Sequence, residues 1–279
     1  MTLPPSELNV RDARERCRRY RLRILDISQQ VSALHIAPAY SCMEIVDVIY
    51  HSLMRHDERH QWRDTFLMSK GHGCLAQYVV LHDLGYLTDV DLVQYCQPQG
   101  RLGAHPDYGI PGIAASTGSL GHGLGMAVGM ALANRLQRDL SHTYVLLSDG
   151  ELQEGSTWEA LMMAANLALD QLTLFLDLND FSGLARMSTD HPAFYPVVEK
   201  LMAFGWHVHA VDGHDAQAIA MAARQRISQR PTAIVCQTIK GKGVTYMENV
   251  PIWHYRSPNA EEYQQARQEL EKVHERAIC

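Results

Sequence analysis

The sequence has no run of about 18 consecutive apolar residues, the length that a helix needs to span a bilayer. Its first residues also lack an apolar core of the length found in secretory signal peptides. We therefore expect a cytoplasmic protein that does not act at a membrane.

Closely spaced cysteine pairs are absent as well. None of the six cysteines belongs to a Cys-x-x-Cys pair, so the sequence indicates neither a zinc site nor a disulfide framework. We expect buried or incidental thiols at Cys17, Cys42, Cys74, Cys96, Cys236 and Cys279.

An excess of positive charge is also lacking. The chain of 279 residues has 25 Lys and Arg against 31 Asp and Glu, a formal net charge of -6. A nucleic-acid surface needs a dense basic patch to neutralise phosphates, so we expect no nucleic-acid partner. The arginines of residues 14–23 lie on a predicted amphipathic helix, where we expect a solvated face or an interface rim.

The chain alternates between predicted helices and strands. Apolar side chains at helical spacing predict a helix over residues 10–31, and Ser41 with Glu44 forms a capping-box pattern that predicts a second helix. Short continuous apolar runs predict strands at residues 143–148, 172–178, 206–211 and 232–238. Further helices are predicted at residues 117–136, 156–169, 215–228 and 258–279.

Strands that are apolar on both sides are typical of a sheet with helices on both faces. Strands that alternate with helices indicate a parallel sheet. We therefore predict an α/β fold with a central, mostly parallel sheet, formed as one domain over residues 1–279.

Polar side chains follow two of the predicted strands. Asp149 and Gly150 end the strand at residues 143–148, and Asn179 ends the next strand. Ligands of open parallel sheets bind beyond these carboxyl ends, and carboxylate and amide oxygens are ligands for Mg²⁺ or Ca²⁺. Glycine allows close approach of the backbone, so a metal-bridged diphosphate is one interpretation and a solvated Asp-Gly turn is the other.

The segment "SDGELQEG" with Asn179 thirty residues on is similar to the thiamine diphosphate motif of the transketolase superfamily, Gly-Asp-Gly followed by Asn. Ser148 replaces the first glycine of that motif. Four more segments resemble the family in the family's order: "SKGHG" (69–73), "TGSLGHG" (117–123), "VDGHD" (211–215) and "KGKGV" with Trp253 and His254. The resemblance covers most of residues 30–255 and implies a thiamine-diphosphate-binding fold.

The resemblance also implies roles for individual residues. The side chains of Asp149 and Asn179 and the carbonyl of Phe181 would hold Mg²⁺ or Ca²⁺, with Gly150 beside the diphosphate. Gly118 and Leu120 would border the aminopyrimidine ring of the cofactor. Lys240 and Lys242 could contact phosphate or belong to a solvated loop.

Acid–base roles are implied for histidines, because the pKa of imidazole lies near neutrality. His72 and His254 would hydrogen-bond the diphosphate or the reacting face of the cofactor, and His35 and His105 would line the substrate channel. Glu154 and Glu159 match acidic residues that link two active sites through a subunit interface.

The resemblance stops where the first domain of a transketolase ends. The chain therefore resembles the N-terminal subunit of a split transketolase, whose partner would supply a pyrimidine-binding and a C-terminal domain. Together they would transfer a two-carbon ketol unit from a phosphorylated ketose to an aldose. The acid that activates the cofactor would lie in the partner, so we expect an inactive isolated chain and an α₂β₂ assembly, or a homodimer when the chain is alone.

Other functions share parts of this pattern. The α-subunit of a 2-oxoacid dehydrogenase has the diphosphate motif, but "SKGHG" and "VDGHD" favour transketolase over it and over deoxyxylulose-phosphate synthase. A non-catalytic binding protein is a further alternative. It is suggested by Gly183, Leu184 and Ala185, which stand where the family usually has Ile-Asp-Gly.

Overall fold

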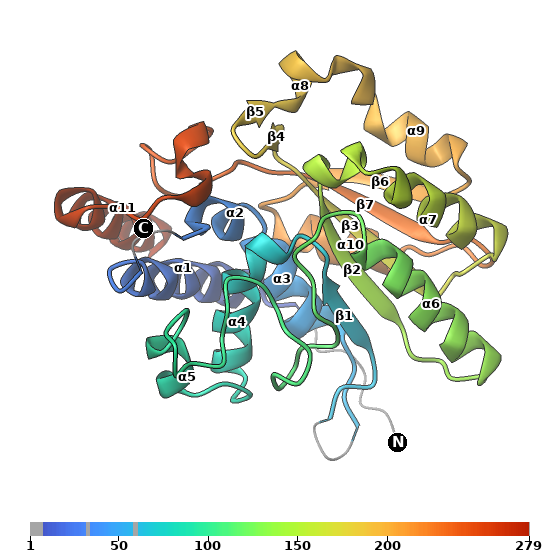
Figure 1. Ribbon diagram of the computed structural model, residues 1–279, viewed down its shortest axis with the longest axis horizontal. Helices are drawn as coiled ribbons and strands as arrows, with labels where there is room; N and C mark the ends of the chain where they lie inside the picture. Colours follow the sequence, from blue (N-terminus) through green and yellow to red (C-terminus); the bar gives the residue numbers. More distant parts are fainter. Residues whose placement is uncertain (1–7, 32–33, 58–60, 279) are drawn as a thin grey trace.

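A five-stranded parallel sheet forms the centre of the protein (Figure 1). The computed structural model describes residues 8–31, 34–57 and 61–278. In spatial order the strands are β1 (Thr65–Met68), β2 (Thr143–Ser148), β3 (Leu172–Leu178), β7 (Thr232–Gln237) and β6 (His207–Asp212). The predicted parallel α/β architecture is confirmed.

Helices cover both faces of the sheet, which explains the continuous apolar strands. Val145 and Leu147 of β2 pack in one core with helices α6 (Gly123–Leu136) and α7 (Gly155–Asn166). Leu146, between them, belongs to a second core with helices on the opposite face. That face carries α1 (Val10–Ile27), α2 (Ile36–Ser41), α3 (Met43–Val48), α4 (Cys74–Asp83) and α10 (Ala216–Arg224).

Shorter elements complete the chain. They are α5 (Asp89–Val93), α8 (Met187–Asp190), α9 (Val197–Ala203), a π-helix (Ile49–Leu53) and 3₁₀ turns at Gly71–Gly73, Asp149–Gln153, Pro192–Phe194 and Pro251–Tyr255. The terminal helix α11 (Ala260–Ile278) packs beside α1 (Figure 1). No helix in the described ranges combines the length and apolar character needed to cross a membrane.

Two local predictions are wrong. Ser41 does not cap a helix: it is the last residue of α2, and its hydroxyl donates to Asp177 on β3 (2.7 Å) instead. The next helix, α3, starts after Cys42 without a side-chain cap. Arg21 does not lie on a solvated face, because it is buried and makes two hydrogen bonds to Glu44 (2.6 and 2.8 Å).

Several boundaries also differ from the predictions. Strand β1 was not predicted, because four residues are too few to give a clear strand pattern. The helix predicted from residue 117 begins at Gly123, since Gly118 and Gly121 have φ of 149° and 84°, values outside the helical range. Of the described cysteines Cys96 is exposed, four are buried and all are free; Cys279 lies outside the described residues.

Candidate functional site

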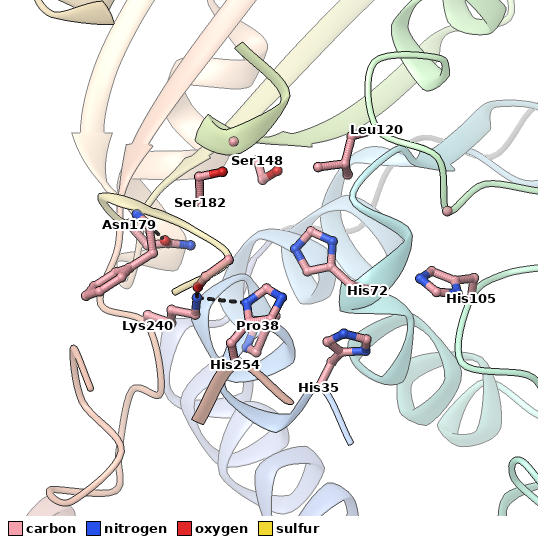
Figure 2. Close-up of a pocket in the computed structure, with 14 residues that line it drawn as sticks. His35, Pro38, His72, His105, Leu120, Ser148, Asn179, Ser182, Lys240 and His254 are labelled. Atoms are coloured by element: carbon pink, nitrogen blue, oxygen red, sulfur yellow. Dashed lines mark hydrogen bonds between the residues drawn. The ribbon is translucent and has the colours of Figure 1, made fainter. Parts of the chain in front are cut away.

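A cavity of about 260 Å³ lies beyond the carboxyl ends of β2 and β3 (Figure 2). The paired strands end in register, with Ser148 opposite Asp177. Most of the predicted site residues line this cavity: His35, His72, His105, Gly118, Leu120, Gly150, Asn179, Phe181 and His254. The fold thus brings together segments that are far apart in the sequence.

The oxygen atoms of Asp149 and Asn179 lie side by side. The Oδ2 atom of Asp149 accepts hydrogen bonds from the backbone N–H groups of Asp180 (2.6 Å) and Phe181 (3.2 Å). The Oδ1 atom of Asn179 accepts from the same N–H of Phe181 at 3.1 Å. One donor therefore holds both oxygens at the tip of the two strands.

The donor set at this point suits a divalent cation. Asp149 is 1% exposed, and burial, followed by the charge of Asp177, raises its pKa to about 7. A bound cation would favour the ionised carboxylate, and hard oxygen ligands are those that Mg²⁺ and Ca²⁺ take. No described group of three or more His, Cys, Asp and Glu could hold a metal, so amide, carbonyl and ligand oxygens have to complete the shell.

Histidine rings form the opposite wall of the cavity. The ring centroid of His35 lies 5.8 Å from that of His72, 6.0 Å from that of His105 and 5.3 Å from that of His254. Burial is the main cause that lowers the pKa of His35 to about 4, that of His254 to about 3 and that of His72 well below 6.5. These three rings are neutral at pH 7, so each offers one donor and one acceptor nitrogen.

Two glycine loops meet behind His72 and Leu120. A Cβ atom on Gly71 would lie 2.9 Å from the backbone of Gly118, so this close approach requires glycine. The buried carboxylate of Glu151 joins the loops to β2, because it accepts hydrogen bonds from Ser69 Oγ and from the backbone N–H groups of Gly121 and Ser148 (both 3.0 Å). Sequence reasoning missed Glu151, which the turn residues around it hid.

Lysine side chains also belong to the site. Lys240 is buried, donates to the carbonyl of Gly183 (2.9 Å) and lies 2.9 Å from Nδ1 of His254 (Figure 2). Burial, followed by the charge of Lys70, lowers the pKa of Lys240 to about 8. Of the two interpretations of this residue, the solvated loop is therefore wrong. Lys70 and its partner Asp177 were not predicted, although a charge inside the apolar run of β3 was a signal.

The remaining predicted residues lie away from the cavity. Glu154 and Glu159 are exposed at the start of α7, and their interface role stays a prediction. Gly183 and Leu184 form the turn between the short strands β4 (Phe181–Ser182) and β5 (Ala185–Arg186). Gly183 has φ of 58° and lines the cavity, whereas Leu184 is 62% exposed at its rim.

Residues 13–275 match the family described as "Transketolase, thiamine diphosphate binding domain". The chain belongs to this family. It is 34% identical over 255 residues to one of the two subunits of an apulose-4-phosphate transketolase of Phocaeicola vulgatus, covering 90% of each chain. It is 36% identical over 244 residues to a 6-deoxy-6-sulfo-D-fructose transketolase subunit of Clostridium sp., covering 85% of this chain and 88% of the relative.

Solved transketolase structures share the fold. The transketolase of Campylobacter jejuni superposes with a TM-score of 0.86 at 27% identity, over 94% of this chain. This chain spans 43% of the length of that protein and 41% of the Leishmania mexicana transketolase. The predicted N-terminal, diphosphate-binding subunit of a split transketolase-type transferase is confirmed.

Proposed function

We propose that this chain binds thiamine diphosphate and Mg²⁺ as one subunit of a transketolase that moves a two-carbon ketol unit from a phosphorylated ketose to an aldose. The observation that carries the proposal is the pair of oxygens of Asp149 and Asn179, which share one backbone donor at the edge of the histidine-lined cavity. We further propose a single cytoplasmic domain over residues 1–279.

At the strand tips, Asp149, Asn179 and the carbonyl of Phe181 would hold the cation, and Ca²⁺ would fit the same oxygens. The backbone near Gly150 and the ammonium group of Lys240 would bind diphosphate oxygens, since both line the cavity. Gly118 and Leu120 would contact the aminopyrimidine ring. When bound, thiamine diphosphate supplies the carbanion chemistry that cleaves the bond next to a ketose carbonyl.

The histidines would position the sugar and move protons. Neutral His35 and His254, with ring centroids 5.3 Å apart, can accept a proton from a substrate hydroxyl and return it. His72 would hydrogen-bond the diphosphate or the reacting face of the cofactor, and His105 would line the channel through which the sugar enters. Burial of these rings excludes bulk water from the proton transfers.

A second polypeptide would complete the active site. Apolar side chains are exposed beside the cavity at Leu184, Ile252 and Tyr255, and Tyr255 also packs on His35 with centroids 4.5 Å apart. Such a rim favours a protein partner over open solvent. We propose that the partner carries the pyrimidine-binding and C-terminal domains and that the complex is α₂β₂, with Glu154 and Glu159 at the interface between active sites.

Reconstitution tests this function. The chain is mixed with the C-terminal transketolase subunit encoded in the same genome, and ketol transfer is assayed with saturating thiamine diphosphate, Mg²⁺ and a panel of phosphorylated and sulfonated ketoses. We expect activity that requires both chains. Calorimetry of the same complex separates an inactive protein that binds the cofactor from one that does not, and absence of both binding and transfer overturns the proposal.

A further inference from the structure

A buried ion pair lies directly behind Asn179. Lys70 and Asp177 are both 0% exposed, and the Nζ atom of Lys70 donates to Oδ2 of Asp177. Oδ1 of Asp177 accepts from the hydroxyls of Ser41 (2.7 Å) and Thr238. Neither charge of the pair touches solvent, and Asp177 does not line the cavity.

Asp177 also holds the amide group of Asn179. The Nδ2 atom of Asn179 donates to Oδ2 of Asp177 (3.2 Å) and to Oγ of Ser41 (3.1 Å). If the amide were turned over, its oxygen would face the carboxylate of Asp177. Its NH₂ group would then face the N–H of Phe181, placing donor against donor. The acceptors on one side thus keep Oδ1 of Asn179 on the side of Asp149.

The same ion pair reaches the histidine wall. Lys70 also donates to the carbonyl of Pro38 (3.1 Å), a residue of helix α2, which begins immediately after His35. Lys70 precedes His72 by two residues in the loop that lines the cavity. Asp177 alone would be an unpaired buried charge, which is strongly destabilising, so Lys70 is needed to keep it ionised.

We propose that Asp177, neutralised by Lys70, is a positioning residue that fixes the amide of Asn179 with its oxygen toward the metal position. This rests on the proposed function, in which Asn179 is a metal ligand. Partners that orient metal ligands typically affect metal affinity by about 10- to 100-fold. The pair thereby joins the orientation of the metal ligand to the position of the histidine loops.

The test removes the pair without leaving a charge behind. In the complex with the partner subunit, Lys70→Met/Asp177→Leu is compared with wild type by electron paramagnetic resonance titration of Mn²⁺ in the presence of thiamine diphosphate. We expect the Mn²⁺ dissociation constant to rise about 10- to 100-fold. The Mg²⁺ concentration for half-maximal activity rises with it.

Two control variants separate positioning from general stability. Thr238→Val removes a donor to Asp177 but leaves both hydrogen bonds of the Asn179 NH₂ group. Arg21→Met/Glu44→Leu removes another buried ion pair, whose residues do not line the cavity. We expect both controls to change the melting temperature while keeping the Mn²⁺ dissociation constant within about twofold of wild type.

The outcomes are distinct. Unchanged Mn²⁺ affinity in Lys70→Met/Asp177→Leu overturns the inference and leaves the proposed function intact. A wild-type complex that binds no Mn²⁺ with thiamine diphosphate overturns both. Should the double variant fail to fold, Ser41→Ala decides, because it removes the second acceptor of the amide and leaves the ion pair in place; wild-type affinity there contradicts the proposal.

Discussion

Asp149 and Asn179 share the backbone N–H of Phe181, which lies 3.2 Å from the carboxylate oxygen and 3.1 Å from the amide oxygen. The two acceptors are thirty residues apart in sequence and end adjacent parallel strands. A shared donor brings two oxygens close without a cation between them, so the predicted metal ligands are already gathered.

The stability of the metal-free chain is expected to depend on the ionisation of Asp149. The fold raises its pKa from 3.8 to about 7, so the unfolded chain loses this proton at lower pH than the folded chain. Stability is therefore lost as the pH rises from about 4 to about 7 and changes no further above that interval.

Melting curves of wild type and Asp149→Asn across this range measure the effect. Wild type is expected to lose melting temperature relative to the variant as the pH rises, and Mg²⁺ with thiamine diphosphate is expected to narrow the gap for wild type only. Parallel pH profiles for the two proteins would contradict the assignment.

Replacing His35 is expected to impair catalysis more than binding. In the reconstituted complex, His35→Ala should lower kcat by about 10²- to 10⁴-fold, the range for a lost general acid–base group. Its dissociation constant for thiamine diphosphate should stay within a few-fold of wild type. His209→Ala, on β6 and outside the cavity lining, is the matched control with wild-type kcat. A similar kcat in both variants would remove His35 from the mechanism.

Glu151 is expected to contribute strongly to stability. Glu151→Ala leaves buried donors at Ser69, Gly121 and Ser148 without their acceptor. At about 1–3 kcal/mol for each unsatisfied group, the free energy of unfolding should fall by roughly 3 kcal/mol or more. Urea denaturation measures this, with the exposed Glu261→Ala as a control expected within about 0.5 kcal/mol of wild type. Equal losses in the two variants would argue against a bracing role.

Glu154 and Glu159 are expected to act only in the assembly. Both are exposed on this chain, so Glu154→Gln/Glu159→Gln should leave its melting temperature unchanged. Sedimentation of the reconstituted complex should show weaker association, and ketol transfer should fall with it. Wild-type association and activity in the double variant would place the proposed interface elsewhere.

The sequence was most informative where the chain repeats a simple physical pattern. Continuous apolar runs identified β2, β3, β6 and β7, because strands covered on both faces need apolar side chains at every position. The residues that end β2 and β3 then pointed to the cavity, since parallel strands present their carboxyl ends at one edge of the sheet. The histidine positions came from the family resemblance and could not be derived from spacing.

What the sequence hid are groups whose meaning depends on distant partners. Lys70 resembles any loop lysine until Asp177, 107 residues away, is found against it. Ser41 matched a local helix cap but instead bonds to the sheet, so a tertiary contact overrode a local pattern. Glu151 sits among turn residues, and its three donors come from separate segments of the chain.

The brace made by Glu151 has a consequence for the way a ligand enters. Because one carboxylate already fastens the loops of Ser69 and Gly121 to the end of β2, little conformational entropy remains to be lost when the cavity fills. Affinity is then not diminished by a folding step. Crystals of the ligand-free and ligand-loaded forms should superpose along these loops, and the rate of association should be governed by diffusion into the cavity and not by loop closure.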